Sequence, residues 1–330
     1  MERIKLERLG GSYFAAPKTN IQFIPSGCKT LDLALGGGWA EGHICNVIGD
    51  SSTGKTLLCI EAAANFINKY IKSRVKWRQT GEAFDENYAQ AIGVDLSKVD
   101  FGDPLETIED LFEDLENIIM KATKPILYIV DSLDSLSDRA EMERGIDAGS
   151  YGIEKHRKLS RLFRQFAGRM SEFVTLLIVS QVRARIGGFG HGPAMTPTGG
   201  FALKFYTAQR VMLAQTGTIS KTISGIKRPY GIRVRAKVIK NKIGLAFRES
   251  EFRILFGYGI DDAEACVSWL AEAKALKDAG LSANGVKEYL KFLDGLGNME
   301  YDKEIAVLQK AVTKRWYEVE RSFLPTRRKY

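Results

Sequence analysis

Residues 49–56 read Gly-Asp-Ser-Ser-Thr-Gly-Lys-Thr and match the pattern GxxxxGK[ST] without a gap. An apolar run precedes them and a helical pattern follows, which is the context that a phosphate-binding loop requires. Glycines let backbone N–H groups surround phosphate oxygens, and the helix N-terminus adds positive potential. The loop therefore predicts a nucleotide site in which Lys55 reaches the β- and γ-phosphates and the Thr56 hydroxyl binds Mg²⁺. The predicted phosphate-binding residues are Gly49, Asp50, Ser51, Ser52, Thr53, Gly54, Lys55 and Thr56.

Two acidic residues beyond this loop could complete an ATP-hydrolysing site. Asp131 directly follows the apolar run 126–130 and is the predicted partner of Thr56 in binding Mg²⁺, because ligands gather at the carboxyl ends of strands in open α/β sheets. Glu82 follows the apolar residues 75–77 and is the candidate to orient the attacking water. Residues 81–120 contain 12 acidic residues and only Lys98 as a base, so a solvated acidic face is the competing interpretation of Glu82.

Alternating apolar runs and helical patterns must position these side chains. Strands are predicted at 44–48, 75–77, 126–130 and 176–179, with helices at 56–70 and 105–121 between them. Strands joined through helices form a parallel sheet with helices on both faces. Closely spaced apolar runs at 211–213, 232–238 and 252–255 then predict antiparallel strands at one side of the sheet.

The predicted fold class is α/β, with a phosphate-loop core and a small helical C-terminal domain. The helical pattern begins at residue 263 and continues to the end of the chain. Three parts are expected: an N-terminal arm that could contact another protomer (1–24), the core (25–262) and the helical C-terminal domain with its basic tail (263–330).

Positive charge is concentrated in one segment of the chain. The formal net charge is +8, yet residues 181–248 contain 13 basic residues and no acidic one. Such a segment favours an anionic partner, with nucleic acid as the leading candidate, and a basic drift of a sheet surface as the alternative. Within it, Arg233, Arg235 and Lys237 share one face of a predicted strand by the two-residue period.

Composition excludes several classes of protein. With 45% hydrophobic and 27% charged residues, the chain is neither collagen-like nor disordered. It has no run of 18 apolar residues, and its first residues lack the apolar core of a signal peptide. We therefore expect a cytoplasmic protein without membrane contact.

Four ordered motifs resemble the RecA family of strand-exchange recombinases over about residues 24–260. They are Pro25-Ser26-Gly27 with Leu31-Asp32-Leu33-Ala34-Leu35-Gly36, then Gln181-Val182-Arg183, then Thr198-Gly199-Gly200 with Ala202-Leu203-Lys204-Phe205-Tyr206, and last Lys240-Asn241-Lys242-Ile243. The modest length is similar to that of phage-type (UvsX-like) members, whose setting would be a phage-infected bacterial cell. The resemblance implies a RecA-like core and a DNA-dependent ATPase. It also implies filaments on single-stranded DNA, with ATP between protomers, that pair with homologous double-stranded DNA in recombination and repair.

The resemblance also implies roles around the nucleotide. Gln181 would sense the γ-phosphate and reorder a DNA-binding loop. Lys240 and Lys242 would reach across a protomer boundary to the neighbour's phosphates, in the manner of arginine fingers. Asp85 and Tyr88 match positions that the family places around adenine.

Further matching positions would contact DNA. The glycine-rich segment 187–200 corresponds to the family's second DNA loop, and residues 143–152 to the first. The latter leads into a predicted helix with several basic residues, for which an ordinary exposed basic face is the alternative. The predicted DNA contacts are Arg183, Arg185, Phe189, Met195, Gly199, Gly200, Arg235 and Lys237.

The chain departs from the family pattern at three places. In an ungapped match the catalytic Glu position is occupied by Gly81, with Glu82 one residue later. Asp50 adds a negative charge to the phosphate loop, and the arm before Ile24 does not clearly match. Two alternatives therefore stay open: a ring-forming motor of the same fold, such as a helicase, and a single-strand annealing or binding protein with weak hydrolysis.

Overall fold

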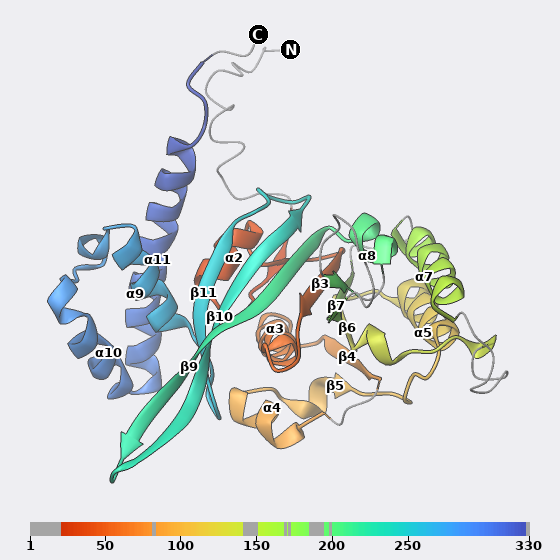
Figure 1. The fold of residues 1–330 in the computed structure, drawn as a ribbon, viewed down its shortest axis with the longest axis horizontal. Coiled ribbons are helices and arrows are strands. Elements are labelled where there is room, and N and C mark those ends of the chain that lie inside the picture. Colours follow the sequence, from red (N-terminus) through yellow and green to blue (C-terminus); the bar gives the residue numbers. More distant parts are fainter. Residues whose placement is uncertain are drawn as a thin grey trace.

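The computed structural model describes residues 21–80, 84–140, 151–167, 170, 173–184, 195–197 and 200–327. Its main feature is a large sheet with the strand order β12-β11-β10-β9-β3-β7-β6-β4-β5, while β8 pairs with β7 (Figure 1). The main strands are β3 (Ile44–Gly49), β4 (Arg74–Gln79), β5 (Val99–Asp100), β6 (Ile126–Asp131), β7 (Val174–Ala184), β8 (Met195–Pro197), β9 (Gln209–Ile223), β10 (Ile226–Asn241), β11 (Glu249–Leu255) and β12 (Gly259–Asp261). A separate two-stranded sheet joins β1 (Phe23–Ile24) and β2 (Trp39–Ala40).

The helices are distributed around this sheet and along the C-terminal region. They are α2 (Lys29–Leu35), α3 (Lys55–Lys69), α4 (Glu86–Ile92), α5 (Ile108–Lys121), α7 (Tyr151–Ala167), α8 (Gly200–Tyr206), α9 (Asp262–Glu272), α10 (Val286–Asp294) and α11 (Asn298–Ser322). Short 3₁₀ helices are η2 (Leu96–Lys98), η3 (Leu133–Ser135), η4 (Leu276–Ala279) and η5 (Ala283–Gly285). Among the residues that the structure describes, no helix combines the length and apolar character needed to cross a membrane.

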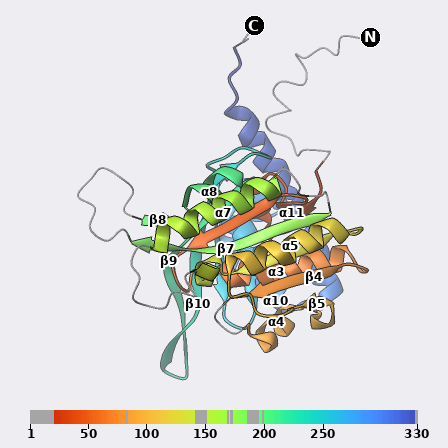
Figure 2. The same ribbon diagram turned by 90° about the vertical axis from the view of Figure 1, so that its right-hand side faces the viewer.

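One half of the sheet is parallel, as predicted, and is covered on both faces. β3, β7, β6, β4 and β5 pair in parallel. On β6, Leu127 and Ile129 belong to the hydrophobic cluster that includes α3, whereas Tyr128 and Val130 belong to the cluster that includes α5 and α7. Figure 2 views the sheet from the side on which α5 and α7 lie. Because successive side chains of a strand point to opposite faces, apolar residues at every position are what a doubly covered strand requires.

Helix α5 shows how local chemistry sets an element boundary. It begins at Ile108, three residues later than the apolar pattern predicts. The Thr107 hydroxyl accepts a hydrogen bond from the Asp110 backbone at 3.1 Å, and the Thr107 backbone donates to the Asp110 carboxylate at 3.0 Å. This capping box satisfies two N–H groups that would otherwise lack partners, and it fixes the helix start.

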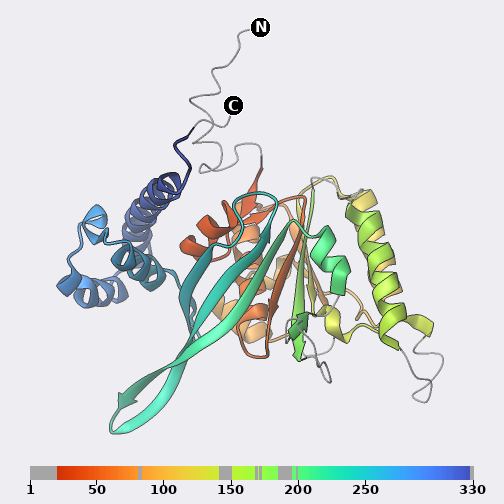
Figure 3. The ribbon, with the colours of Figure 1, turned by 45° about the horizontal axis from the view of Figure 1, so that its top comes forward.

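The other half of the sheet is antiparallel, and this prediction is also confirmed. β9 pairs with β3 in parallel, and β10, β11 and β12 follow in antiparallel pairs. Val234, Ala236 and Val238 are buried, whereas Arg235 and Lys237 are exposed on the opposite face of β10. β9 and β10 are much longer than predicted and continue as a two-stranded ribbon that projects from the body (Figure 3).

Between Asp262 and Ser322 the chain forms α9, α10 and α11, joined by turns and the short helices η4 and η5. Buried side chains of α9 and α11 belong to the same hydrophobic cluster as α3 and the sheet. The rings of Trp269 and Trp316 lie 5.3 Å apart, and Arg248 of the strand region forms an ion pair with Glu320 of α11. The C-terminal helices therefore pack on the core rather than only being linked to it.

A buried carboxyl group lies at this junction and makes stability depend on pH. Burial raises the pKa of Asp32 to about 7. The charge of Asp262 also raises this pKa, and the charge of Lys29 lowers it. Its Oδ1 accepts a hydrogen bond from the Ser26 backbone N–H at 2.8 Å. Because the pKa is higher in the folded than in the unfolded chain, the cost of ionisation is absent near pH 4, grows up to pH 7 and is complete above it.

We expect Asp32→Asn to stabilise the protein at pH 8 and to be nearly neutral at pH 4.5. Asn keeps the oxygen that accepts from Ser26 and removes the charge whose burial is unfavourable. Thermal unfolding at both pH values measures this, with a gain of roughly 1–2 °C for each kcal/mol, because the entropy of unfolding grows with chain length and this chain has 330 residues. A variant that is less stable than the wild type at pH 8 would contradict the assignment.

Candidate functional site

The phosphate loop joins the end of β3 to the start of α3. Gly54 has φ of 89°, and a Cβ at this position would lie 2.4 Å from Cδ1 of Ile254, so only glycine fits. Lys55 is 8% exposed, and its ammonium group donates a hydrogen bond to the Asp50 carbonyl at 2.5 Å. The Thr53 hydroxyl donates to the same carbonyl at 2.9 Å. These bonds hold the loop curved around the helix N-terminus, where an anion is favoured.

Asp50 does not line the pocket beside this loop. It is exposed, and its Oδ1 accepts a hydrogen bond from the Ser51 backbone N–H at 2.8 Å. The carboxylate therefore uses one backbone donor of the loop and lies outside the pocket wall formed by Ser51, Ser52 and Gly54.

A pocket of about 580 Å³ lies at the carboxyl ends of the parallel strands. This volume suits a nucleotide, since small-molecule and cofactor sites commonly occupy 300–1,000 Å³, roughly. Its wall is built from the phosphate loop, the ends of β4, β6 and β7, the start of α4 and the region of β10 and β11. The lining residues predicted from the sequence are Ser51, Ser52, Gly54, Lys55, Thr56, Asp85, Tyr88, Asp131 and Gln181.

Thr56 and Asp131 both line this pocket, as a Mg²⁺ site requires. Thr56 is exposed at the start of α3, and Asp131 is half-buried at the end of β6. A hydroxyl and a carboxylate are hard oxygen ligands, and Mg²⁺ usually takes one or two such protein groups together with phosphate and water oxygens. The donor set therefore fits the ion.

The start of α4 forms one side of the pocket and carries Asp85 and Tyr88, the two residues that the family resemblance predicts around adenine. The Asp85 carboxylate caps this helix by accepting from the Tyr88 backbone N–H at 2.9 Å. Burial raises the pKa of Tyr88, with Glu61 and Asp85 adding to the effect, so its ring stays neutral. Phe84, which the sequence reasoning missed, also lines the pocket, and its ring packs on Trp77 and Phe101 with centroids 4.6 and 5.0 Å away.

Gln181 lies where the nucleotide pocket meets the β7–β8 hairpin. It is paired with Gly49 across β3 and β7, and its backbone N–H donates to Asp134 Oδ2 at 2.7 Å. Asp134 is 8% exposed and belongs to η3, directly after β6. Asp134 therefore fixes the backbone of Gln181, a contact that the sequence analysis missed.

Lys240 and Lys242 lie away from the nucleotide pocket of their own protomer. Lys240 pairs with Arg210, which pairs with Asn46, three residues before the phosphate loop begins at Gly49. The Lys240 ammonium donates to the carbonyls of Lys204 and Phe205 at 2.7 and 2.8 Å. Burial and the charges of Lys242 and Arg210 lower the pKa of Lys240 to about 8. The Lys240 ammonium group therefore contacts the end of α8 and not the phosphate loop of its own chain.

Arg235 and Lys237, two of the predicted DNA contacts, are paired with acids of the neighbouring strand. Arg235 contacts Glu251 at 2.7 Å and Lys237 contacts Glu249 at 2.8 Å. Glu249 and Glu251 lie just after the acid-free segment in the sequence, but strand pairing places them opposite Lys237 and Arg235. The charge count along the sequence therefore overstates the positive potential of this face.

Several predicted positions lie partly or wholly outside the described residues. Glu82, Arg185, Phe189 and Gly199 are outside, as are most of the positions expected to form the first DNA loop. For three more positions only the backbone is described: Arg183 pairs with Thr196 in the β7–β8 hairpin, Met195 pairs with Ala184, and Gly200 begins α8.

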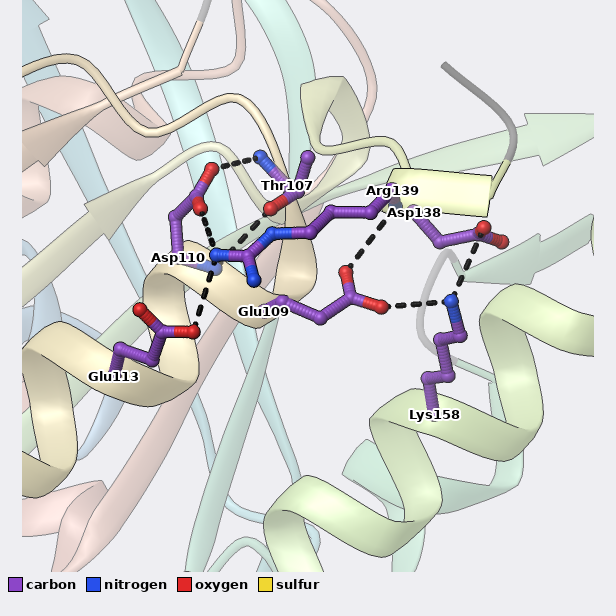
Figure 4. Close-up of polar contacts among 7 residues, drawn as sticks. All are labelled: Thr107, Glu109, Asp110, Glu113, Asp138, Arg139 and Lys158. Carbon is purple, nitrogen blue, oxygen red and sulfur yellow. Dashed lines mark hydrogen bonds and ion pairs between the residues drawn. The ribbon is translucent and has the colours of Figure 1, made fainter. Parts of the chain in front are cut away.

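Part of the acidic face pairs with basic residues of α7 and of the segment before it (Figure 4). Lys158 lies 2.7 Å from Glu109 and 3.2 Å from Asp138. Arg139 lies 2.7 Å from Asp110, and its backbone N–H donates to Glu109 at 3.3 Å. Glu109 of α5 therefore contacts one residue that precedes the segment 141–150, Arg139, and one residue that follows it, Lys158. Lys158, one of the basic residues of the predicted α7 face, is thus paired within the protein.

Comparison with known proteins agrees with this arrangement. The family model of the RecA N-terminal domain matches residues 6–261, and so includes most of the arm that the sequence motifs did not clearly match. "Protein RecA" of Nostoc punctiforme is 35% identical over 275 residues, which cover 82% of this chain and 73% of that protein.

Two further relatives give the same result. "Protein RecA" of Gloeothece citriformis is 33% identical over 273 residues, covering 82% of this chain and 74% of that protein. "Protein RecA" of Synechocystis is 34% identical over 278 residues, covering 82% and 75%. A phosphate loop and Gln181 at the ends of adjacent parallel strands, and a family match over most of the chain, lead to one conclusion: the chain belongs to the RecA family of recombinases.

Proposed function

We propose that this chain polymerises on single-stranded DNA with ATP between protomers, and that the filament pairs with a homologous duplex and exchanges strands. Membership of the family makes the chain an ATP-dependent DNA recombinase and a DNA-dependent ATPase. The observation that carries the filament proposal is that neither Lys240, near the end of β10, nor Lys242, directly after β10, lines the pocket of its own protomer. A neighbouring protomer would bring its pocket to these lysines.

Mg²⁺ is part of this proposal. Thr56 and Asp131 would hold it, and the ion would supply charge neutralisation at the phosphates. Lys55 would bind the β- and γ-phosphates from the loop, and Asp85 and Tyr88 would hold the base. Glu82 would orient the attacking water. Asp134 holds the backbone of Gln181 in β7, and β7 pairs with β8. A movement of the Gln181 side chain would therefore displace these two strands, to which the predicted second DNA loop is connected.

The remaining parts of the proposal concern setting and organisation. A phage-type origin and a cytoplasmic location in a phage-infected bacterial cell are the setting we propose. Residues 1–24 would act as an arm that contacts another protomer, 25–262 as the ATPase and DNA-binding core, and 263–330 as a helical accessory domain. The DNA contacts proposed on the core are Arg183, Arg185, Phe189, Met195, Gly199, Gly200, Arg235 and Lys237.

Electron microscopy with single-stranded DNA and a non-hydrolysed ATP analogue tests the proposal. We expect helical filaments whose length depends on both DNA and nucleotide. Closed rings would instead identify a motor of the same fold. DNA-coated particles that form equally without nucleotide would identify an annealing or binding protein.

A further inference from the structure

The ribbon formed by β9 and β10 extends far beyond the sheet. Leu213 of β9 pairs with Gly49 at the start of the phosphate loop, and β9 continues for ten more residues to Ile223. The ribbon ends in a two-residue turn, Ser224–Gly225, in which both residues have positive φ, as tight hairpins require. Residues 220–230 are all exposed, and the ribbon stands clear of the rest of the molecule (Figures 1 and 3).

The tip of this ribbon carries positive charge that the protein does not neutralise. Lower on the ribbon, Arg235 and Lys237 are paired with Glu251 and Glu249. Within the residues that the structure describes, Lys221, Lys227 and Arg228 have no acidic partner. These three residues therefore contribute positive charge to the segment 181–248 that no acidic side chain of the described residues neutralises.

The tip side chains are ordered by the strand register. Lys221 lies directly opposite Arg228, and Ile223 directly opposite Ile226, so these four side chains share one face of the ribbon. Ile223 and Ile226 are 64% and 59% exposed. Two like charges directly opposite each other destabilise an isolated hairpin. An anionic partner would relieve this repulsion, and the isoleucine pair offers that partner an apolar contact.

We propose that the ribbon tip, defined as Lys221, Ile223, Ile226, Lys227 and Arg228, binds duplex DNA. A two-stranded ribbon fits a groove of the double helix, which a single strand does not have. The basic residues would contact the phosphates on either side, and the isoleucines would contact the sugars or wedge at a base step. This inference rests on the proposed function for its partner and adds a contact surface distinct from Arg235 and Lys237.

The first test removes the charge of the tip. In fluorescence anisotropy with a labelled duplex, Lys221→Ala with Lys227→Ala and Arg228→Ala should weaken binding about tenfold or more near 0.1 M salt. The dependence of log K on log salt should become shallower by up to about 2.7, because each lost phosphate contact accounts for about 0.9. Hydrolysis stimulated by single-stranded DNA should stay within about twofold of the wild type.

A matched control removes the same charge elsewhere. Lys72, Lys121 and Lys124 are exposed and lie before the N-terminal ends of β4 and β6, at the opposite edge of the sheet. Replacing all three by Ala should leave both the duplex affinity and its salt dependence close to those of the wild type. An equal loss in this control would show that only the net charge matters, and would overturn the proposal.

The second test removes the apolar pair. Ile223→Ser with Ile226→Ser should weaken duplex binding while the salt dependence stays unchanged, since no phosphate contact is lost. Both sets of variants change only exposed side chains, and thermal unfolding will confirm that the fold is retained.

Two results would overturn the proposal. One is wild-type duplex affinity and salt dependence in the charge variant. The other is loss of filaments on single-stranded DNA with duplex affinity intact, which would identify the tip as a contact between protomers. Because the assay uses duplex alone, ribbon-dependent duplex binding by a chain that never forms filaments would refute the proposed function and leave this inference standing.

Discussion

Replacing Lys55 by Ala should reduce ATP hydrolysis by at least about 100-fold, the usual effect of removing a group that stabilises charge in a transition state. The ammonium group lies at the N-terminus of α3 and is held by the Asp50 carbonyl at 2.5 Å, so it is already positioned over the curved loop. Its removal takes away the positive charge closest to the phosphates, whereas the backbone donors of the loop remain. Steady-state phosphate release with and without single-stranded DNA measures the effect.

Two companion variants make this result specific. Lys55→Arg keeps the charge, but the planar guanidinium needs more room than the buried ammonium, so hydrolysis should also fall. Lys69→Ala removes a lysine from the other end of the same helix, where it pairs with Glu41, and should leave hydrolysis within about twofold, as expected for a surface ion pair. Hydrolysis retained by Lys55→Ala would contradict the phosphate-binding role.

The sequence predicted well those elements whose signal is local. The strands around Leu127 and Val179 are uniformly apolar because both of their faces are covered, and the phosphate loop is a contiguous motif. In each case the residue types near one position are enough to determine its environment.

The ribbon formed by β9 and β10 was not predicted from the sequence beyond the short apolar runs 211–213 and 232–238. Residues 214–230 are rich in Gly, Thr, Ser and Lys, and both faces of the ribbon are exposed there, so no apolar alternation marks the strands. They pair through the ladder of backbone hydrogen bonds, which requires no particular side chain. Periodic spacing of apolar residues indicates which side chains of an element are buried, so it does not reveal a strand whose side chains are all exposed.

Contacts between distant segments were the other gap. The Asp134 carboxylate meets the Gln181 backbone 47 residues away, and Glu251 meets Arg235 across a strand pair. Neither contact follows from spacing, because it depends on which strands become neighbours in the sheet. At the DNA contact that we propose for Arg235, DNA would have to compete with Glu251 for this side chain, which would weaken that contact.

Removing Lys240 and Lys242 together should abolish DNA-stimulated hydrolysis while leaving nucleotide binding nearly unchanged. The two lysines lie away from their own pocket, and the charges of Lys242 and Arg210 help to lower the pKa of Lys240 to about 8. A cluster in which like charges oppose each other gains stability from an anion, and a neighbour's phosphates would supply one. We expect Lys240→Ala with Lys242→Ala to lose about 100-fold or more in stimulated turnover, with the affinity for a fluorescent ATP analogue within about threefold because the monomer's pocket is intact.

Mixing two inactive variants decides whether these lysines act on the neighbour. Lys55→Ala protomers lack a working pocket but keep Lys240 and Lys242, whereas the double-lysine variant keeps its pocket and lacks the reaching residues. In an equal mixture about one interface in four joins an intact pocket to intact lysines, so hydrolysis should return to roughly that fraction of the wild-type rate. Lysines that served their own protomer's pocket would give no recovery, since every pocket would then be incomplete within its own chain.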